Sequence, residues 1–341
     1  MRYPEFIKKG DTIGFAAPAF GCATEPYYTA FKNSLKKWRE KGFQVKLGPN
    51  CYADKGIGIS NTPEKCAGEL MGLMEDPEAD CVISCGGGEL MCEIVPWLDF
   101  DRLAKAPAKW FMGYSDNTNM TFLLTTLADT AAVYGPCAAA FGMEPWHPAI
   151  ADACDLLQGK NLTVHNYDKW ERESRKDAEH PLEPYHVTEG FCMHSVRVGT
   201  GDRFGGRLLG GCLDCLSNLA GTRFDRVREF TERYKEDGIL WFLESCELNT
   251  MDIRRTLWNL REAGWFGNAS GFLIGRPMVF DEPVMGLDQY EAVTGILGEY
   301  GVPILMDLDI GHTAPMMPLI SGAYATVLVG GNEVRIAMEE R

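Results

Sequence analysis

The chain has 341 residues, a length typical of two domains, and its 45% hydrophobic and 24% charged content is ordinary for a globular protein. Its net charge of −15 argues against partners rich in phosphate, so we expect neither nucleic acid nor an anionic membrane surface as a ligand. No apolar run reaches about 18 residues, and the first residues show no signal-peptide pattern. We therefore expect a cytoplasmic protein without a membrane span.

The first 150 residues alternate between strand-like and helix-like segments. The predicted strands are residues 12–17, 43–47, 81–85, 110–112 and 131–134, and the predicted helices are residues 27–41, 65–75 and 118–127. This alternation favours an α/β fold with a parallel sheet covered by helices. In such sheets ligands bind at the carboxyl ends of the strands.

The second half is richer in predicted strands. They are residues 191–198, 238–243, 272–274, 304–306, 325–329 and 334–338. The last two flank Gly330-Gly331-Asn332, which predicts a terminal hairpin. Between the predicted strands 238–243 and 272–274, residues 251–263 have the periodicity of an amphipathic helix. Asp252 is the predicted N-cap of this helix and Gly264 ends it.

Residues 160–187 break this pattern, because they are dense in charge and lack a core stripe. We therefore divide the chain into three parts. Residues 1–160 form an N-terminal α/β domain with the nucleophile, residues 161–190 form a connector, and residues 191–341 form a smaller, β-rich C-terminal domain.

Ser115 is the most informative candidate for chemistry. It lies in Gly113-Tyr114-Ser115-Asp116, between a predicted strand and a predicted helix. A sharp turn at that place presents a hydroxyl as a nucleophile, and the helix N-terminus behind it offers backbone N–H groups. The match to G-x-S-x-G is partial, because Asn117 stands where the second glycine would be. The alternative is a serine that only caps the helix.

A serine nucleophile needs a base and an orienting acid. Of the six histidines, His312 follows a predicted strand and a glycine, whereas His147, His165, His180, His186 and His194 lie in a loop or near the charged connector. Glu244 follows the apolar run Trp241-Phe242-Leu243, where a carboxylate is costly without a partner. The alternatives are a capping role for His312 in its loop and a turn-capping role for Glu244.

An oxyanion needs amide donors. The backbone N–H of Asp116 is one candidate, and Gly87 within Gly86-Gly87-Gly88 is another, because glycine lets the backbone approach a ligand closely. A phosphate-binding loop is the alternative, but neither phosphate-loop nor dinucleotide fingerprint is present, which also argues against a dehydrogenase.

Twelve cysteines are a high count for a chain without an export pattern, and we interpret most of them as small buried residues in a reducing compartment. Cys212 and Cys215 form a C-x-x-C pair. No second ligand pair stands at close spacing, so the pair favours packing over a zinc site.

With these residues in hand, the chain resembles the LD-carboxypeptidase family of serine peptidases, which includes murein tetrapeptide carboxypeptidase and the microcin C self-immunity protein. The matching pieces are Gly10-Asp11-Thr12-Ile13 with Ala17-Pro18, Gly86-Gly87 followed by Pro96-Trp97-Leu98-Asp99-Phe100, Phe111-Met112-Gly113-Tyr114-Ser115-Asp116, Tyr134-Gly135-Pro136, Gly210-Gly211-Cys212-Leu213 with Gly221-Thr222, Phe242-Leu243-Glu244, and Gly311-His312.

The resemblance implies a nucleophile at Ser115, an orienting acid at Glu244 and a base at His312. It also implies an amidotransferase-like N-terminal domain, a homodimer, and no cofactor or metal. The chain departs from the murein-type pattern at Cys85, at Gly88-Glu89 and at Cys212, where an asparagine is usual. The length, the charged connector with Trp170, and Tyr134-Gly135-Pro136 lean toward the microcin-immunity members.

Two substrates compete under this resemblance. The first is the L,D-amide bond of a murein-type peptide; the second is the acyl link of an aminoacyl sulfamoyl or phosphoramidate adenosine. The nucleotide would require an aromatic platform, for which Trp170 or Trp146 is available, and Gly86 and Gly88 are further expected substrate contacts. A function of another class also stays open, a non-catalytic binding protein on the same scaffold.

Overall fold

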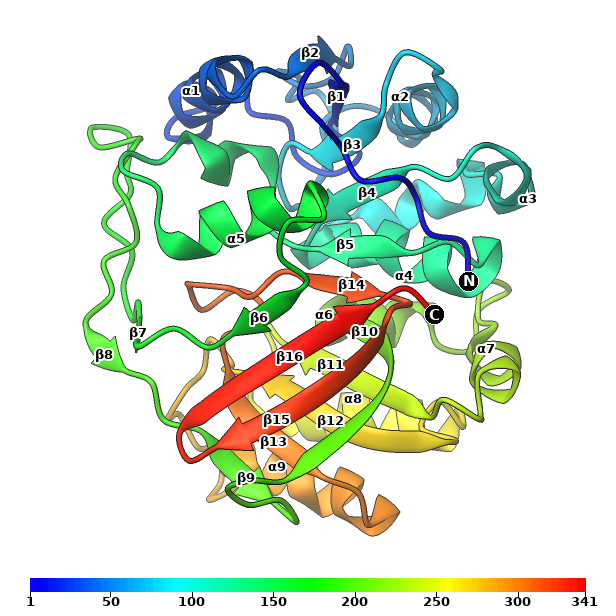
Figure 1. Cartoon of the computed structure of the whole chain (residues 1–341), viewed down its shortest axis with the longest axis vertical. Coiled ribbons are helices and arrows are strands. Elements are labelled where there is room, and N and C mark those ends of the chain that lie inside the picture. Colours follow the sequence, from blue (N-terminus) through cyan, green and yellow to red (C-terminus); the bar gives the residue numbers. More distant parts are fainter. The chain divides into compact units, whose positions relative to one another are not determined.

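The computed structural model describes residues 1–341, which divide into two compact units (Figure 1). Unit 1 comprises Met1–Asn161 and Glu173–His186, and unit 2 comprises Leu162–Arg172 and Val187–Arg341. The predicted α/β architecture, with a parallel sheet and a second sheet, is confirmed. None of the helices combines the length and the apolar composition that crossing a bilayer requires.

Unit 1 is built on a parallel sheet in the strand order β2-β1-β3-β4-β5. The strands are β1 (Thr12–Ala16), β2 (Gln44–Leu47), β3 (Cys81–Ser84), β4 (Trp110–Gly113) and β5 (Ala132–Tyr134). Figure 1 shows helices around this sheet: α1 (Tyr27–Glu40), α2 (Pro63–Glu75), α3 (Phe100–Lys105), α4 (Thr118–Ala128) and α5 (Pro148–Leu157). The order reverses between β1 and β3, and in doubly wound sheets that reversal opens a crevice at the carboxyl ends of the strands.

Short 3₁₀ turns complete unit 1 and shape the loops at its sheet edge. They are η1 (Met91–Glu93), η2 (Val95–Trp97), η3 (Ser115–Asn117) and η4 (Ala138–Gly142). The core strands β3, β4 and β5 are buried along their whole length, which explains their continuous apolar sequence. Gly86–Gly88 and Ser115 follow β3 and β4, so both lie at the carboxyl edge of this sheet.

Unit 2 has an eight-stranded mixed sheet in the order β6-β16-β15-β10-β11-β12-β13-β9. Its parallel centre is β10 (Arg203–Cys212), β11 (Ile239–Glu244), β12 (Ala269–Gly275) and β13 (Ile304–Leu308). The antiparallel flanks are β6 (Thr163–His165), β9 (His194–Val196), β15 (Tyr324–Gly330) and β16 (Glu333–Glu339). The last two form the predicted terminal hairpin, which is confirmed.

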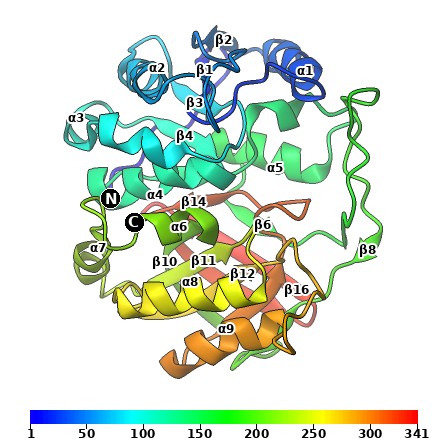
Figure 2. The same ribbon diagram turned by 180° about the vertical axis from the view of Figure 1, so that it is seen from behind.

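The remaining elements of unit 2 are short strands and helices. They are β7 (Lys169–Trp170), β8 (Glu189–Gly190), β14 (Leu319–Ser321), α6 (Leu213–Leu219), α7 (Val227–Arg233), α8 (Thr250–Glu262), α9 (Gln289–Leu297) and η5 (Gly298–Tyr300). Figure 2 shows α8 and α9 side by side on one face of the sheet. Ile253, Leu257 and Leu260 of α8 are buried, as the periodicity predicted.

The predicted cap of α8 is wrong. The helix begins one residue earlier than predicted, at Thr250, and its N-cap is Asn249, whose Oδ1 accepts from the backbone N–H groups of Met251 and Asp252 at 2.9 and 3.0 Å. Asp252 lies in the first turn instead, where its carboxylate pairs with Arg255. Asparagine and aspartate are both good N-caps, and because the helix starts at Thr250, the residue before it, Asn249, is the cap.

Candidate active site

Ser115 occupies a backbone conformation that few non-glycine residues adopt. Its φ is +64°, in the left-handed region, and it opens the turn η3 directly between β4 and α4. Such a conformation costs roughly 1–3 kcal/mol and persists only where the surroundings enforce it. The predicted sharp turn with a serine at the carboxyl edge of the sheet is therefore present in unit 1.

Asn117, the residue that breaks the G-x-S-x-G pattern, holds the neighbouring glycine loop. Its side chain is fully buried, and Nδ2 donates to the carbonyl oxygens of Gly86 at 2.8 Å and of Tyr114 at 3.0 Å. The hydroxyl of Ser84 also donates to the Gly86 carbonyl, at 3.0 Å. The asparagine thus fastens the loop after β3 to the turn after β4.

Asp116 makes a second connection between these loops. Its carboxylate is buried and accepts from the backbone N–H of Met91 at 2.7 Å and from Asn119 Nδ2 at 3.1 Å. Gly88 lies against the same carboxylate, since a Cβ on that glycine would stand 3.0 Å from Oδ2. The side chain of Asp116 is therefore structural, whereas its backbone N–H is the group that we expect at an oxyanion.

Gly87 lies beside the serine hydroxyl. A Cβ at this residue would stand 3.0 Å from Ser115 Oγ, so only glycine leaves space next to that oxygen. The backbone N–H of Ser115 donates to the hydroxyl of Tyr134 at 3.3 Å. Of the predicted site residues, unit 1 thus brings together Ser115, Asp116 and the loop of Gly86, Gly87 and Gly88.

Glu244 and His312 form a close pair in unit 2. Glu244 ends the fully buried strand β11 and is 1% exposed. His312 lies in the loop after β13, and its Nδ1 is 2.8 Å from Glu244 Oε2. A buried carboxylate is tolerated when it is paired, so the pairing explains how an acid can end so apolar a strand.

Two glycines make room for this pair. Gly311 has a φ of +95°, and a Cβ there would overlap the carboxylate of Glu244. A Cβ on Gly275, at the end of β12, would stand 2.8 Å from the Cβ of Glu244 and would overlap the carbonyl of Ile310. The backbone around the acid is therefore packed too closely for any side chain at either residue.

The charge of Glu244 governs the titration of His312. Burial lowers the pKa of His312, but the adjacent Glu244 carboxylate, together with a hydrogen bond to Cys246, raises that pKa further, so it lies well above the ordinary value. A carboxylate on Nδ1 also fixes the tautomer of the ring and leaves Nε2 as the atom for proton transfer. Within unit 2 the pair has the chemistry of a general base with its orienting acid.

Cys212 also lies beside Glu244 and His312, a proximity that the sequence did not predict. It ends β10 and stands directly opposite Glu244 in the parallel register of β10 and β11. One ligand atom from each of Cys212, Glu244 and His312 lies within 4.8 Å of the others. The strand was missed because Gly205, Gly206, Gly210 and Gly211 interrupt it. The apolar pair Leu208-Leu209, both buried, was the available signal.

Trp170 is 5% exposed in this structure. Its ring packs 5.3 Å from that of Phe280 and 4.5 Å from the guanidinium of Arg276. Arg276 is itself buried and pairs with Asp309 at 3.1 Å. Burial raises the pKa of Asp309 to about 6, although the guanidinium opposes that shift. The tryptophan is thus one wall of a buried cluster around a cation.

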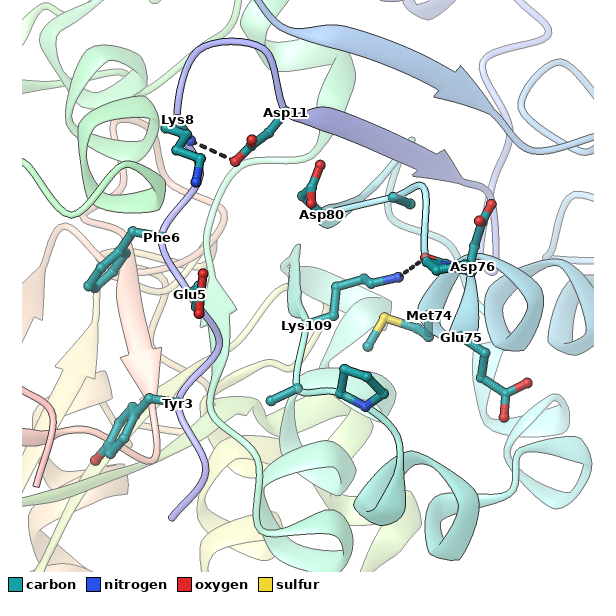
Figure 3. A pocket seen from close by; sticks show the side chains of 14 residues that line it. Tyr3, Glu5, Phe6, Lys8, Asp11, Met74, Glu75, Asp76, Asp80 and Lys109 are labelled. Atoms are coloured by element: carbon teal, nitrogen blue, oxygen red, sulfur yellow. Dashed lines mark hydrogen bonds between the residues drawn. The ribbon is translucent and has the colours of Figure 1, made fainter.

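A separate cavity of about 480 Å³ opens at the opposite, amino edge of the unit 1 sheet (Figure 3). Asp11, Asp80 and Lys109, which precede β1, β3 and β4, contribute to its lining. Lys109 is mostly buried and donates from Nζ to the carbonyl oxygens of Leu73 at 2.9 Å and Asp76 at 2.6 Å. None of the predicted site residues lines this cavity.

Comparison with known proteins agrees with this architecture. Residues 13–135 match the LD-carboxypeptidase N-terminal domain and residues 205–327 match the LD-carboxypeptidase C-terminal domain, together more than half of the chain. The chain is 28% identical to a probable murein peptide carboxypeptidase of Bacillus subtilis over 336 residues, which cover 95% of this chain and 91% of that protein.

Similarity extends to a second kind of relative. The microcin self-immunity protein MccF of Escherichia coli is 27% identical over 331 residues, which cover 93% of this chain and 90% of that protein. Among solved structures, an MccF-like protein from Bacillus anthracis superposes with a TM-score of 0.82 at 21% identity, covering 99% of this chain and all of that one. That likeness shows a common fold. The predicted resemblance is confirmed, and the chain belongs to the LD-carboxypeptidase family.

Proposed function

We propose that this peptidase-family member is a serine hydrolase that cleaves amide bonds through an acyl-enzyme. Ser115 is the nucleophile, His312 the base and Glu244 the acid that orients the imidazole. The observation that carries the proposal is the 2.8 Å pair of His312 Nδ1 and Glu244 Oε2, and the strained turn that presents Ser115 supports it.

The reaction runs in two steps. Ser115 Oγ attacks the substrate carbonyl and gives its proton to His312; the backbone N–H of Asp116 and an amide near Gly87 stabilise the oxyanion. His312 then protonates the leaving amine as the amide bond breaks. In the second step His312 takes a proton from water, and the resulting hydroxide attacks the ester carbonyl. The bond to Ser115 Oγ breaks, His312 returns the proton to that oxygen, and the acid product leaves.

The leading substrate is an L,D-amide bond of a murein-type peptide. The 28% identical relative from Bacillus subtilis is described as a probable murein peptide carboxypeptidase, which supports this choice. Hydrolysis would release a terminal D-amino acid. We further propose that the protein acts in the cytoplasm and that it forms a homodimer. Light scattering on the purified protein tests the dimer.

The second candidate is the acyl link of an aminoacyl nucleotide. It is supported by structures of MccF in complex with aspartyl sulfamoyl adenosine, at a TM-score of 0.80, and with glutamyl sulfamoyl guanosine, at 0.81. For this substrate the aromatic contact that we propose is Trp170, with Gly86 and Gly88 near the reacting group. Because Trp170 is almost buried, such a contact requires its ring to become accessible.

One experiment tests the mechanism and separates the substrates. The purified protein is incubated with murein tetrapeptide ending in D-Ala, with its all-L diastereomer, and with aspartyl sulfamoyl adenosine, and products are identified by mass spectrometry. We expect Ser115→Ala to lower turnover of the accepted substrate about a thousandfold or more. The exposed Ser174→Ala serves as the matched control. Full turnover by Ser115→Ala contradicts the mechanism, and a binding protein would turn over neither substrate.

A further inference from the structure

Three different metal-ligating side chains converge at the carboxyl ends of β10 and β11. Cys212 and Glu244 are Cα partners in the register of the two strands, and His312 reaches them from the loop after β13. One ligand atom of each lies within 4.8 Å of the other two. Cys212 is 2% exposed and Glu244 is 1% exposed, whereas the side chain of His312 is 13% exposed.

The donor set and its dimensions suit a borderline-soft divalent cation. Sulfur, imidazole nitrogen and carboxylate oxygen are the three donors that Zn²⁺ takes in proteins, and a tetrahedral ion at the usual bond lengths separates its ligands by roughly 3.3–3.6 Å. The Nδ1–Oε2 distance of 2.8 Å would have to open slightly, and all other separations are already below 4.8 Å. A pair of ligand atoms as far apart as 4.8 Å would have to close by roughly 1.2 Å when an ion binds.

Asp214 supplies the outer layer that holds the thiol in place. Cys212 Sγ donates to its Oδ2 at 3.3 Å. The carboxylate is fixed in turn, because it accepts from the backbone N–H groups of Cys246 at 3.0 Å and Glu247 at 2.9 Å. The hydrogen bond orients the thiol of the metal-free protein, and it is lost when the sulfur binds the ion as a thiolate. By contrast Cys215, the other cysteine of the C-x-x-C pair, is not part of the three-ligand group.

We propose that Cys212, Glu244 and His312 bind Zn²⁺ and that the ion reversibly inhibits the protein. The three side chains leave one coordination place for water. The thiol proton passes to the solvent when the sulfur binds the ion. The inhibitory part rests on the function proposed above. An ion bound to Nδ1 of His312 and to the Glu244 carboxylate takes the orienting acid away from the ring and makes Nε2 a weaker base.

Metal binding is tested first, without turnover. The full-length protein is stripped with a chelator and titrated with Co²⁺, whose bond to a thiolate gives a charge-transfer band in the near ultraviolet. The band is expected in the wild-type protein and in Cys215→Ser, and it should be absent in Cys212→Ser and Cys212→Asn. Competition by Zn²⁺ gives the affinity. We expect each Cys212 variant to bind at least about tenfold more weakly, since even the loss of an outer-layer partner commonly costs 10–100-fold.

Circular dichroism establishes that the variants are folded. If one of the two Cys212 variants does not fold, the other still tests the site. A wild-type protein without the band, or a band of equal strength in both folded Cys212 variants, overturns the site. Turnover is then compared in Zn²⁺ and in chelator for each protein. A fall of at least about tenfold in the wild type and a smaller fall in the Cys212 variants support inhibition.

The two proposals fail separately. Zn²⁺ that binds through Cys212 without changing turnover overturns the inhibition and leaves the site. Ser115→Ala leaves all three proposed metal ligands in place, so this variant should keep the Co²⁺ band. If that variant keeps the band and also keeps full turnover, the serine mechanism is wrong while the metal site stands.

Discussion

Gly311 lies with its backbone against the carboxylate of Glu244, so closely that a Cβ on the glycine would overlap Oε2. The residue before the proposed base thus limits where the proposed orienting acid can stand. A single loop of unit 2 therefore sets both the position of His312 and the space left for its partner.

Gly311→Ala is expected to displace the Glu244 carboxylate and to lower kcat about a hundredfold, because small misplacements of catalytic groups cost that much. Gly301→Ala is the matched control. Gly301 also has a positive φ, of +70°, but no atom lies within 4 Å of the place of its Cβ. Both variants carry backbone strain of roughly 1–2 kcal/mol, which thermal unfolding measures. Equal effects of the two on kcat would show that strain alone matters.

Gly87→Ala is expected to place a methyl group about 3.0 Å from Ser115 Oγ and to crowd the approach of a substrate carbonyl. Gly87 is not among the residues with positive φ, so its backbone accepts alanine without strain. We expect kcat/KM to fall on the order of a hundredfold with little change in melting temperature. Gly72→Ala, which meets no atom within 4 Å in α2, should leave turnover unchanged. Wild-type kinetics for Gly87→Ala would exclude this glycine from the site.

Thiol reactivity should separate the cysteines by burial. Burial raises the pKa of Cys137 to about 12 and that of Cys154 to about 11. A raised pKa reduces the reactive thiolate at pH 8, whereas a more alkaline solution restores it. We expect iodoacetamide at pH 8 to label the exposed Cys192 first and to spare Cys137 and Cys154 until the protein is unfolded. Peptide mass spectrometry locates the labels, and early labelling of Cys137 in folded protein would contradict the packing.

Asn249→Ala should lower the free energy of unfolding by about 1 kcal/mol, because two backbone N–H groups at the start of α8 lose their acceptor. Asp252→Ala is the comparison, since its carboxylate only pairs with the exposed Arg255. Surface pairs of that kind are worth about 0–1 kcal/mol. Chemical denaturation measures both. A larger loss for Asp252→Ala would restore that residue as the cap.

Local signals in the sequence predicted much of the fold. The strand before Ser115 and the helix after it are visible as an apolar run followed by a helical segment, and both are present as β4 and α4. The glycine-interrupted strand β10 was not predictable in this way, because its stability comes from pairing with β11 and β15 rather than from its own residues. The start of α8 was also not predictable from local signals, because Asn249 and Asp252 are both suitable caps and lie only three positions apart.

The candidate site was predictable in its residue types but not in its contacts. Glu244 and His312 were singled out at strand ends, and the structure pairs them although 68 residues separate them in the chain. The left-handed φ of Ser115 and the hydrogen bond from Asn117 to the Gly86 carbonyl depend on loops that meet only in the folded sheet. Likewise, the neighbourhood of Cys212 and Glu244 follows from strand register, which spacing along the sequence does not encode.

The register of β10 and β11 has a consequence for the evolution of this chain. Side chains alternate between the two faces of a strand, so one inserted or deleted residue in either strand would turn its terminal side chain to the other face. Glu244 would then leave His312, and Cys212 would leave Glu244. Length changes in unit 2 should therefore be confined to loops. A relative that exchanges Cys212 for another residue changes the side-chain chemistry beside Glu244 without changing the strand register.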